Sequence, residues 1–375
     1  EVLKLTADPS FIAFAAGNPS AEFFPVEQLK KLTDSVLEAS VLQYSVTEGY
    51  EPLREMVALR YGKKYGIGGD EDAVMITSGG QQVINLVTQC LVNSGDVVLC
   101  ENPSFVGALN TFRAYGAKLV GIPVTEQGMD LDALEEALRT YRNVKLIYTI
   151  PTFQNPSGTT MPIENRKRIL ELARKYDVMI LEDSPYFELS FDGEITPAIK
   201  SLDTDGYVVF AGSFSKTIAP GIRVGFSIAP KWISSRMAIA KQTQDVHTNG
   251  VFMRVVYKYL RDFNVDAHIS QYRELYARKS GLMLSLMDEL FDTRVKYTRP
   301  AGGLFLWCDL PDGYSGTVLA NSLLEKKVAI VPGAAFDVNE NIDNPGFRLN
   351  FSVPSEAQIK TGIALLADGI RGYLK

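Results

Sequence analysis

The stretch "YVVFAGSFSKTIAPGIRVGFSIA", residues 207–229, sets a polar turn between two apolar runs that are typical of buried strands. The turn carries Ser213, Ser215, Lys216 and Arg223. Taken alone, it is consistent with a solvated loop that bears two cations, or with one wall of a binding site at the mouth of a sheet. The flanking sequence is needed to distinguish these interpretations.

Short apolar runs alternate with longer segments of helical periodicity from about Ala73 to Ala229. The runs are "AVMIT", "VVLC", "KLVGIPV", "VKLIYTI", "VMILED" and "YVVFAGS". Continuous apolar strands bounded by helices are typical of strands that are buried on both faces. The sequence therefore predicts an α/β fold with a mostly parallel sheet sandwiched by helices.

The C-terminal part of the chain has a different pattern. Residues 264–291 and 355–374 have helical periodicity, and the strands expected between them are "RVKYT", "GLFLWCDL", "VAIV" and "FRLNFS". We therefore expect a large domain at residues 31–270, a smaller α+β domain at residues 271–375, and an N-terminal arm, residues 1–30, that packs with the small domain.

Composition excludes several classes of function. The chain has 375 residues and a net charge of −6, with no basic arm of the kind that binds nucleic acid. Three separated cysteines and two histidines argue against a disulfide framework and against a metal site. No apolar run has the length of a membrane span and no signal peptide opens the sequence, so we expect a cytoplasmic enzyme without membrane contact.

Polar residues directly follow five of the predicted strands. These residues occur in "SGGQQ", "ENPSF", "PTFQNPSG", "EDSPY" and "GSFSK". Ligands of open α/β sheets bind beyond the carboxyl ends of the strands, so the five segments are expected to form one site. This expectation favours the second interpretation of the opening turn, in which Lys216 faces a site.

One part of this predicted site is suited to a phosphate. Gly79 and Gly80 begin a helix, where free backbone N–H groups and the positive end of the helix dipole attract an anion. Ser213, Ser215 and Arg223 could complete the cradle, the arginine with its fixed fork of donors.

The other part is suited to a pyridine aldehyde. A carboxylate at the position of Asp183 needs a cationic partner if it is buried, and a protonated pyridine nitrogen supplies one. Lys216 would form a Schiff base with an aldehyde. Pyridoxal 5′-phosphate combines the phosphate, the ring nitrogen and the aldehyde in one cofactor.

The order of the motifs identifies a family. They are "AAGNPSAEFFP", "LQYSVTEGYEPLRE", "TSGGQQ", "ENPSF", "PTFQNPSGTTM", "LEDSPY", "GSFSKTIAPGIRVGF" and "FRLNFS". In this order they resemble the fold-type-I, class I pyridoxal-phosphate-dependent aminotransferases, and most of all the branch of 2-aminoadipate and kynurenine aminotransferases. The resemblance covers nearly the whole chain and implies transfer of an amino group from an L-amino acid to a 2-oxo acid, with 2-oxoglutarate as the expected acceptor.

The resemblance implies a role for each residue that meets the cofactor ring. Lys216 holds the cofactor and carries the substrate proton, and Asp183 keeps the pyridine nitrogen protonated. Asn155 and Tyr186 hydrogen-bond the ring hydroxyl, and Tyr186 belongs with Lys216 and Asp183 to the catalytic group. Phe105 stacks on the ring, at a position where many relatives have tyrosine.

The resemblance also implies contacts with phosphate, substrate and a second subunit. Gly80 and Gln81 meet the phosphate through their backbones, although many relatives have serine at position 80. Arg348 grips the substrate α-carboxylate together with Asn155, and Gly17 borders the substrate pocket. Tyr50 resembles the tyrosine that reaches the neighbouring subunit's cofactor, which implies a homodimer.

Two alternatives to a transaminase stay open at this stage. Some bacterial transcriptional regulators fuse a DNA-binding winged helix to a ligand-sensing domain of this kind, and the sequence begins at Glu1 without a methionine. A lyase or decarboxylase on the same scaffold is the second alternative, because the cofactor permits several bond cleavages.

Overall fold

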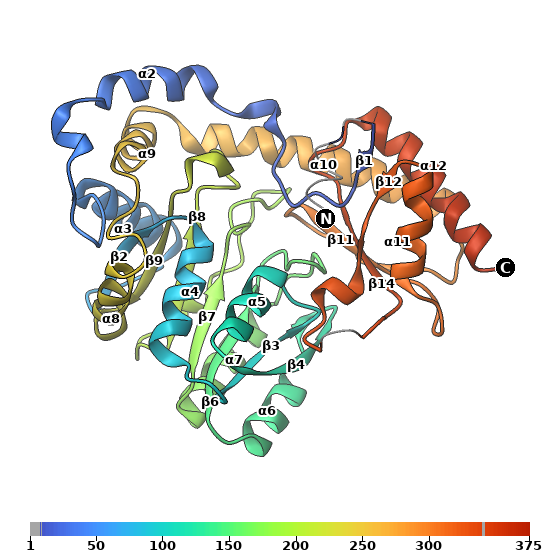
Figure 1. Cartoon of the computed structure of the whole chain (residues 1–375), viewed down its shortest axis with the longest axis horizontal. Helices are drawn as coiled ribbons and strands as arrows, with labels where there is room; N and C mark the ends of the chain where they lie inside the picture. Colours follow the sequence, from blue (N-terminus) through green and yellow to red (C-terminus); the bar gives the residue numbers. More distant parts are fainter. Residues whose placement is uncertain (1–7, 9, 340–341) are drawn as a thin grey trace.

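A large twisted sheet dominates the computed structural model, which describes residues 8, 10–339 and 342–375 (Figure 1). Its strand order is β2-β9-β8-β7-β6-β3-β4-β5. The strands are β2 (Asp72–Thr77), β3 (Val97–Asn102), β4 (Lys118–Thr125), β5 (Gly128–Met129), β6 (Val144–Thr149), β7 (Met179–Asp183), β8 (Val208–Ser213) and β9 (Gly225–Pro230). Neighbours from β4 through β3, β6 and β7 to β8 are parallel, whereas β9 is antiparallel to both of its neighbours and β5 is antiparallel to β4.

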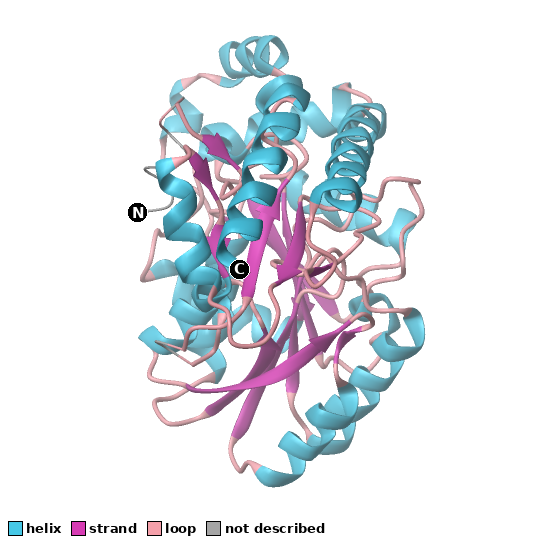
Figure 2. Ribbon diagram, turned by 90° about the vertical axis from the view of Figure 1, so that its right-hand side faces the viewer, coloured by secondary structure: helices cyan, strands magenta, loops and turns pink. Residues whose placement is uncertain are grey.

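Both faces of this sheet are buried, because alternate side chains of each strand enter two separate apolar clusters. In β3, Val98 and Cys100 belong to one cluster and Val97 and Leu99 to the other. The first face packs against α4 (Gly80–Leu91), α5 (Val106–Ala114) and α8 (Lys231–Gln242), and the second against α6 (Leu131–Thr140) and α7 (Ile163–Tyr176). Figure 2 shows helices on both sides of the strands. The predicted mostly parallel sheet between helices is confirmed.

A smaller antiparallel sheet follows in the C-terminal part, with the order β10-β11-β14-β13. Its strands are β10 (Lys296–Tyr297), β11 (Phe305–Asp309), β13 (Val331–Pro332) and β14 (Gly346–Asn350). The helices α10 (Val265–Leu290) and α12 (Glu356–Tyr373) pack against each other beside it, close to the two helices that the sequence predicts there. In Figure 1, α10 runs from the region of the large sheet to that of the small one.

The N-terminal segment joins this C-terminal part. Strand β1 (Ile12–Ala13) pairs in parallel with β12 (Val328–Ala329), and the backbone N–H of Asn350 donates to the carbonyl of Phe14. The expected division into an arm and two domains stays a prediction, and its boundary between residues 270 and 271 falls inside the continuous helix α10.

The remaining elements complete the connections. They are α2 (Val26–Val36), α3 (Glu51–Tyr65), α9 (Gly250–Asp262), α11 (Gly316–Glu325) and the short 3₁₀ helices η1 (Ala21–Phe23), η2 (Ala39–Leu42), η3 (Ile199–Leu202), η4 (Pro220–Ile222) and η5 (Gly333–Phe336). Among the described helices, none has both the length and the apolar character that a membrane crossing requires.

Candidate active site

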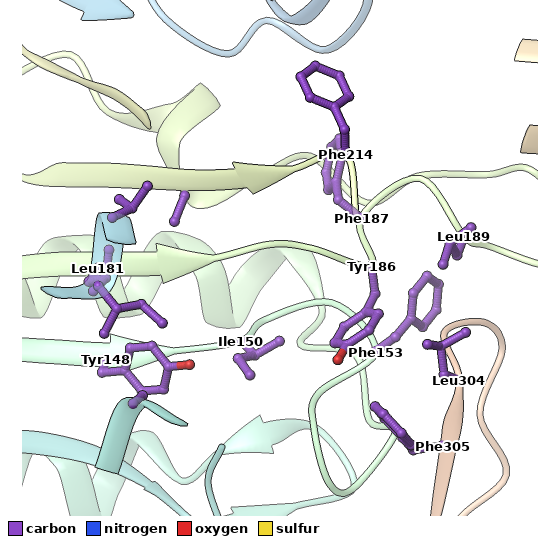
Figure 3. Packing of buried hydrophobic residues seen from close by; sticks show 14 of the residues in the cluster. Tyr148, Ile150, Phe153, Leu181, Tyr186, Phe187, Leu189, Phe214, Leu304 and Phe305 are labelled. Carbon is purple, nitrogen blue, oxygen red and sulfur yellow. The ribbon is translucent and has the colours of Figure 1, made fainter. Parts of the chain in front are cut away.

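The carboxyl ends of β2, β3, β6, β7 and β8 lie at one edge of the large sheet. Strand β2 belongs with the others, since it and β8 are both antiparallel to the strand β9 between them. Figure 3 shows side chains at this edge, where Tyr186 follows the end of β7 and its ring lies edge-on to Phe305 of the small sheet, with centroids 5.7 Å apart. The small sheet therefore lies next to the edge at which the five polar segments emerge.

Lys216 is half-buried at this edge and contacts residues from distant parts of the chain. Its Nζ donates to the carbonyl of Gly17 at 2.8 Å and lies 5.9 Å from the ring centroid of Tyr186. Loss of surrounding water lowers the pKa of Lys216 to about 8, and the charges of Arg348 and Arg223 act in the same direction. At neutral pH a larger fraction of this amine is therefore unprotonated than in a solvated lysine, and only that form is a nucleophile.

Asp183 is a buried carboxylate at the end of β7. Its Oδ2 accepts a hydrogen bond from the hydroxyl of Tyr148 on the adjacent strand β6, at 2.8 Å. Burial raises the pKa of Asp183 to about 6, against the opposing effects of Tyr148 and Lys216. Such a carboxylate gains from a cationic ligand group at its free edge, and a protonated ring nitrogen is one.

Arg348 lies on β14 and brings the small sheet into the same cluster. Its Nη1 donates to Oδ1 of Asn155 at 2.8 Å, and its Nη2 donates to the carbonyls of Ala15 and Ala16 at 3.1 and 3.3 Å. Its guanidinium stacks over the ring of Phe305 at 4.1 Å, and burial lowers the pKa of Arg348 to about 10. The buried Nε has no hydrogen-bond partner within the described residues, so a donor is left for a ligand carboxylate.

The turn between β2 and α4 forms a narrow cradle. Gly79 has φ 86° and caps the helix that begins at Gly80, and Arg223 Nη2 donates to the carbonyl of Ser78 at 3.1 Å. A Cβ on Gly79 would lie 2.6 Å from Arg223 Nη2, and one on Gly225 would lie 2.7 Å from the carbonyl carbon of Gly79. Only glycine fits this approach of backbone to guanidinium.

Two serines extend this cradle from the end of β8. Ser213 and Ser215 are buried, and Ser213 Oγ accepts from the backbone N–H of Ser215 at 3.2 Å. A Cβ on Gly80 would be 3.8 Å from Cβ of Ser213, so the serine turn lies against the start of α4. Backbone donors, hydroxyls and an arginine thus surround one position, as a phosphate requires.

An ion pair between the fully buried Lys241 and the half-buried Asp245 supports the cradle, and sequence reasoning missed it. Asp245 Oδ2 accepts from Ser78 Oγ at 2.8 Å, and its Oδ1 accepts from Nζ of the fully buried Lys241 at 2.6 Å. Lys241 and Asp245 are four residues apart, a spacing more often found in solvated pairs on helix surfaces. The sequence gives no signal that the lysine of this particular pair is buried.

Phe105 and Gln81 lie together at the start of α5. Gln81 Nε2 donates to the carbonyl of Gly107 at 3.0 Å and to Thr111 Oγ1 at 2.8 Å. A Cβ on Gly107 would lie 2.5 Å from both Gln81 Oε1 and Phe105 Cζ, so the phenyl ring lies over this glycine. The side chain of Gln81 is engaged by α5, which leaves its backbone N–H, at the start of α4, for a ligand.

Within one chain, the contacts of Tyr50 are with α9 and not with this cluster. Its ring lies under the guanidinium of Arg254 at 4.5 Å and edge-on to Tyr257, with centroids 5.6 Å apart. The cluster thus collects the other predicted site residues, from Gly17 to Arg348, whereas Tyr50 lies elsewhere.

A separate cavity of about 990 Å³ is lined by other residues of the two sheets, including Asn102, Ser157–Thr160, Lys296 and Trp307. Lys216 and Asp183 do not line it. It contacts the second half of the loop that carries Asn155, and it contains none of the predicted site residues.

The residues present fit pyridoxal 5′-phosphate. A glycine turn with an arginine suits the phosphate, and a buried carboxylate with a raised pKa suits a protonated ring nitrogen. An amine with a lowered pKa suits an aldehyde, and the unpartnered Arg348 Nε suits the carboxylate of an amino acid.

Comparison with known proteins gives consistent matches over the full length. The profile of the family "Aminotransferase class I and II" matches residues 9–366. The chain is 40% identical over 382 residues to an aromatic-amino-acid aminotransferase of Thermococcus litoralis, covering 100% of this chain and 91% of that protein. It is 37% identical over 380 residues to a 2-aminoadipate transaminase of Thermus thermophilus, covering 100% of this chain and 94% of that one.

A solved structure with the same fold is a kynurenine aminotransferase of Pyrococcus horikoshii in complex with PMP. It superposes with a TM-score of 0.96 at 38% identity, over 100% of this chain and 94% of that chain. The similarity therefore includes both sheets and the N-terminal segment that packs on the smaller one.

Proposed function

Since this chain belongs to the family of class I and II aminotransferases and is a pyridoxal-phosphate-dependent transaminase, we propose that the cluster around Lys216 is its catalytic centre. It transfers an amino group between an amino acid and a 2-oxo acid. The observation that carries the proposal is the meeting of the amine of Lys216, the carboxylate of Asp183 and the buried guanidinium of Arg348 at one sheet edge.

Lys216 and Asp183 have different chemical roles in this proposal. When bound, pyridoxal phosphate supplies an aldehyde that joins to amines and a ring that spreads negative charge from the substrate α-carbon. Lys216 Nζ would hold the cofactor through this aldehyde, and its free amine would move the proton of the substrate α-carbon. Asp183 accepts a hydrogen bond from Tyr148 and would keep a proton on the ring nitrogen, which would make the ring a stronger acceptor of charge.

The remaining residues of the cluster orient the reactants. Asn155 follows β6 and Tyr186 follows β7, and both would hold the ring hydroxyl of the cofactor, while Phe105 would pack against the ring. Arg348 binds the carboxylate of donor and acceptor alike, with Asn155 beside it. The bond between Lys216 and the carbonyl of Gly17 supports the N-terminal segment as a border of the substrate pocket. A fixed carboxylate directs the α-hydrogen toward Lys216, which favours proton loss over loss of CO₂.

A donor and acceptor panel tests this function. The names of the relatives suggest aromatic amino acids, 2-aminoadipate and kynurenine as L-amino-acid donors, each supplied with 2-oxoglutarate. The holoenzyme should lose its visible absorption with a good donor alone and recover it when a 2-oxo acid is added. Release of CO₂ or ammonia in place of a 2-oxo acid would indicate a lyase, and binding of donors without any product would indicate a ligand sensor.

Replacing Arg348 by alanine should raise KM for every donor and acceptor by about 10-fold to 100-fold, the equivalent of about 1.4–2.8 kcal/mol. The reason is that the charged hydrogen bonds lost are made to the carboxylate that all these substrates share. Initial rates over the whole panel measure it. Arg348→Lys keeps the positive charge but not the forked donors, so its KM values should lie between those of wild type and Arg348→Ala. Arg299, which pairs with Asp288, belongs to the part of the chain that carries the small sheet, and Arg299→Ala should leave every KM unchanged. A KM that rises for only some substrates would assign Arg348 to their side chains instead.

We further propose a homodimer in which Tyr50 completes the neighbouring site. The exposed side chains of Leu42, Tyr44, Val46 and Val246 form an apolar patch, in which Leu42 is 71% and Tyr44 is 79% exposed. The first three residues precede Tyr50 in the sequence, and Val246 follows Asp245. Tyr44 lies edge-on to His247, which joins the two segments of the patch. Since Asp245 supports Ser78 in the phosphate cradle, a partner that covers the patch would lie next to the cradle.

A mixed dimer of Tyr50→Phe and Lys216→Ala chains tests the shared site. If Tyr50 serves the neighbour, one of the two sites has neither lesion, and the mixed dimer should retain about half of the wild-type activity. Chains carrying different affinity tags allow the mixed dimer to be isolated and assayed at limiting cofactor. Were Tyr50 to serve its own chain, both sites would carry a lesion, and the activity of the mixed dimer would not exceed about half of that of the Tyr50→Phe homodimer.

A further inference from the structure

The loop from Pro151 to Met161, which carries Asn155, is closed by its own hydrogen bonds. The N–H of Met161 donates to the carbonyl of Pro151 at 2.8 Å, and the N–H of Gln154 donates to the carbonyl of Thr159 at 2.9 Å. The first eight residues of the loop are buried. The backbone N–H and C=O groups of a buried loop need hydrogen-bond partners, because each unpaired group costs free energy.

Gln154 makes the connection between this loop and its surroundings. Its Nε2 donates to Glu101 Oε2 at 3.1 Å and to the carbonyl of Pro103 at 2.9 Å, and its Oε1 accepts from the N–H of Ser157 at 2.7 Å. It therefore ties the loop of Asn155 to the end of β3 and to the turn that leads to Phe105. The loop of Asn155 and the turn that leads to Phe105 are the two segments that meet the cofactor ring in the proposed site.

Glu101 is the acceptor on which this arrangement depends. It is 1% exposed and accepts from Thr149 Oγ1 at 2.6 Å and from the N–H of Ile150 at 3.1 Å, as well as from Gln154. Glu101 follows Leu99 by two residues on β3, so it lies on the α6 and α7 face of the sheet, whereas Asp183 lies on the opposite face with Tyr148. Among the described residues, the hydrogen bonds of Glu101 are to Thr149, Ile150 and Gln154, and none is to Lys216, Asp183 or Arg348.

Burial of a carboxylate without a cation is costly, and its three donors offset only part of that cost. Burial raises the pKa of Glu101 to about 7, and the charge of Asp183 acts in the same direction. A leucine at this position would avoid the free-energy cost of burying a carboxylate. The presence of Glu101 is therefore explained by the groups that its hydrogen bonds hold in place.

We propose that Glu101, acting through Gln154, is a positioning residue that fixes Asn155 against the cofactor ring and against Arg348. The inference rests on the role proposed above for Asn155. Because Asn155 Oδ1 accepts from Arg348 Nη1 at 2.8 Å, a shift of the loop would disturb the ring contact and the carboxylate clamp together.

The test compares Glu101→Leu, Glu101→Gln and Asn155→Ala as holoenzymes. Two readouts do not need turnover: the dissociation constant of pyridoxal phosphate by equilibrium dialysis, and the pH midpoint of the visible absorption band, which responds to hydrogen bonds at the ring hydroxyl. Glu101→Leu should raise the dissociation constant by about tenfold and shift the midpoint in the same direction as Asn155→Ala. In Glu101→Gln the amide nitrogen can donate to Thr149 Oγ1 while the oxygen keeps both bonds of Oε2, so values within about twofold of wild type are expected.

Glu182 provides a matched control. It is a fully buried carboxylate near the end of β7, which is separated from β3 by β6, and it accepts hydrogen bonds from the N–H groups of Ile199 and Lys200, neither of which belongs to the loop of Asn155. Glu182→Leu should lower the melting temperature as Glu101→Leu does but leave the dissociation constant and the midpoint unchanged. Equal shifts in both variants would overturn the inference, because general loosening would then explain them.

Two further outcomes separate this inference from the proposed function. A midpoint that moves in Asn155→Ala but not in Glu101→Leu would overturn the positioning role and leave the function intact. A midpoint that moves in neither variant would overturn the role of Asn155, and the positioning role with it. Should Glu101→Leu fail to fold, Gln154→Leu removes the link while Glu101 keeps two of its three donors, and it is judged by the same shifts.

Discussion

Lys216→Ala is expected to lower the rate of transamination by at least about 10³-fold, within the range that a positioned proton carrier contributes. The variant loses the amine that holds the cofactor and moves the substrate proton, whereas the phosphate cradle, the serine turn and Asp183 are untouched. It should therefore bind pyridoxal phosphate but fail to cycle. Single-turnover absorption measurements with a donor, followed by 2-oxoglutarate, measure both properties.

Two controls identify which property of Lys216 matters. Lys216→Arg keeps the positive charge near Gly17 and Tyr186 but has no neutral amine at working pH, so it should be as inactive as Lys216→Ala. Added methylamine should restore part of the rate of Lys216→Ala, because a free amine can carry the proton. A rate above about one tenth of wild type in Lys216→Ala would mean that another group moves the proton.

The convergence of the site could be predicted from the sequence because a simple rule of sheet geometry governs it. Parallel strands end at the same edge, so the residues that follow them meet even when they are far apart in the chain. Asp183 is the last residue of β7, and Asn155 and Lys216 follow β6 and β8, so each lies at the end of a different strand of the parallel series. The rule does not reveal the direction of a strand relative to its neighbours. Nothing in "VGFSIA" indicates that β9 runs antiparallel to β8 and β2, between which it lies.

The hydrogen bonds that support the site residues could not be predicted in the same way. Tyr148 lies inside the apolar run "VKLIYTI" and has the pattern of a core residue, but its hydroxyl carries the hydrogen bond to Asp183. Glu101 lies in the recognised segment "ENPSF", yet its partner Gln154 is 53 residues away. Local sequence constrains the backbone and the alternation of side chains, whereas these bonds depend on how two strand ends and a loop close on each other.

Asp183→Asn is expected to cut turnover by at least about tenfold, the equivalent of about 1.4 kcal/mol in the activation free energy. Without its charge the ring nitrogen loses its proton, and negative charge at the substrate α-carbon is less well stabilised. Steady-state kcat with saturating cofactor measures the effect. Asp183→Glu should retain more activity, and Tyr148→Phe, which removes only the 2.8 Å hydrogen bond to the carboxylate, should show a smaller loss. Normal turnover in Asp183→Asn would show that another group controls the ring nitrogen.

The same substitution should stabilise the cofactor-free chain, which separates a functional carboxylate from a structural one. The pKa of Asp183 is about 6 in the folded chain, where burial raises it, against its ordinary value of 3.8, so the folded state binds more protons than the unfolded state between these two pH values. The contribution of Asp183 to the free energy of unfolding therefore falls as the pH rises from about 4 to about 6, and it stays reduced above that range. Asparagine removes this loss and can still accept from Tyr148, so the cofactor-free variant should be more stable than wild type by roughly 1–3 kcal/mol at pH 8 and by much less at pH 4. Denaturant unfolding at the two pH values measures the difference. A variant that is less stable than wild type at pH 8 would mean that the charge of Asp183 supports the fold rather than the bound cofactor.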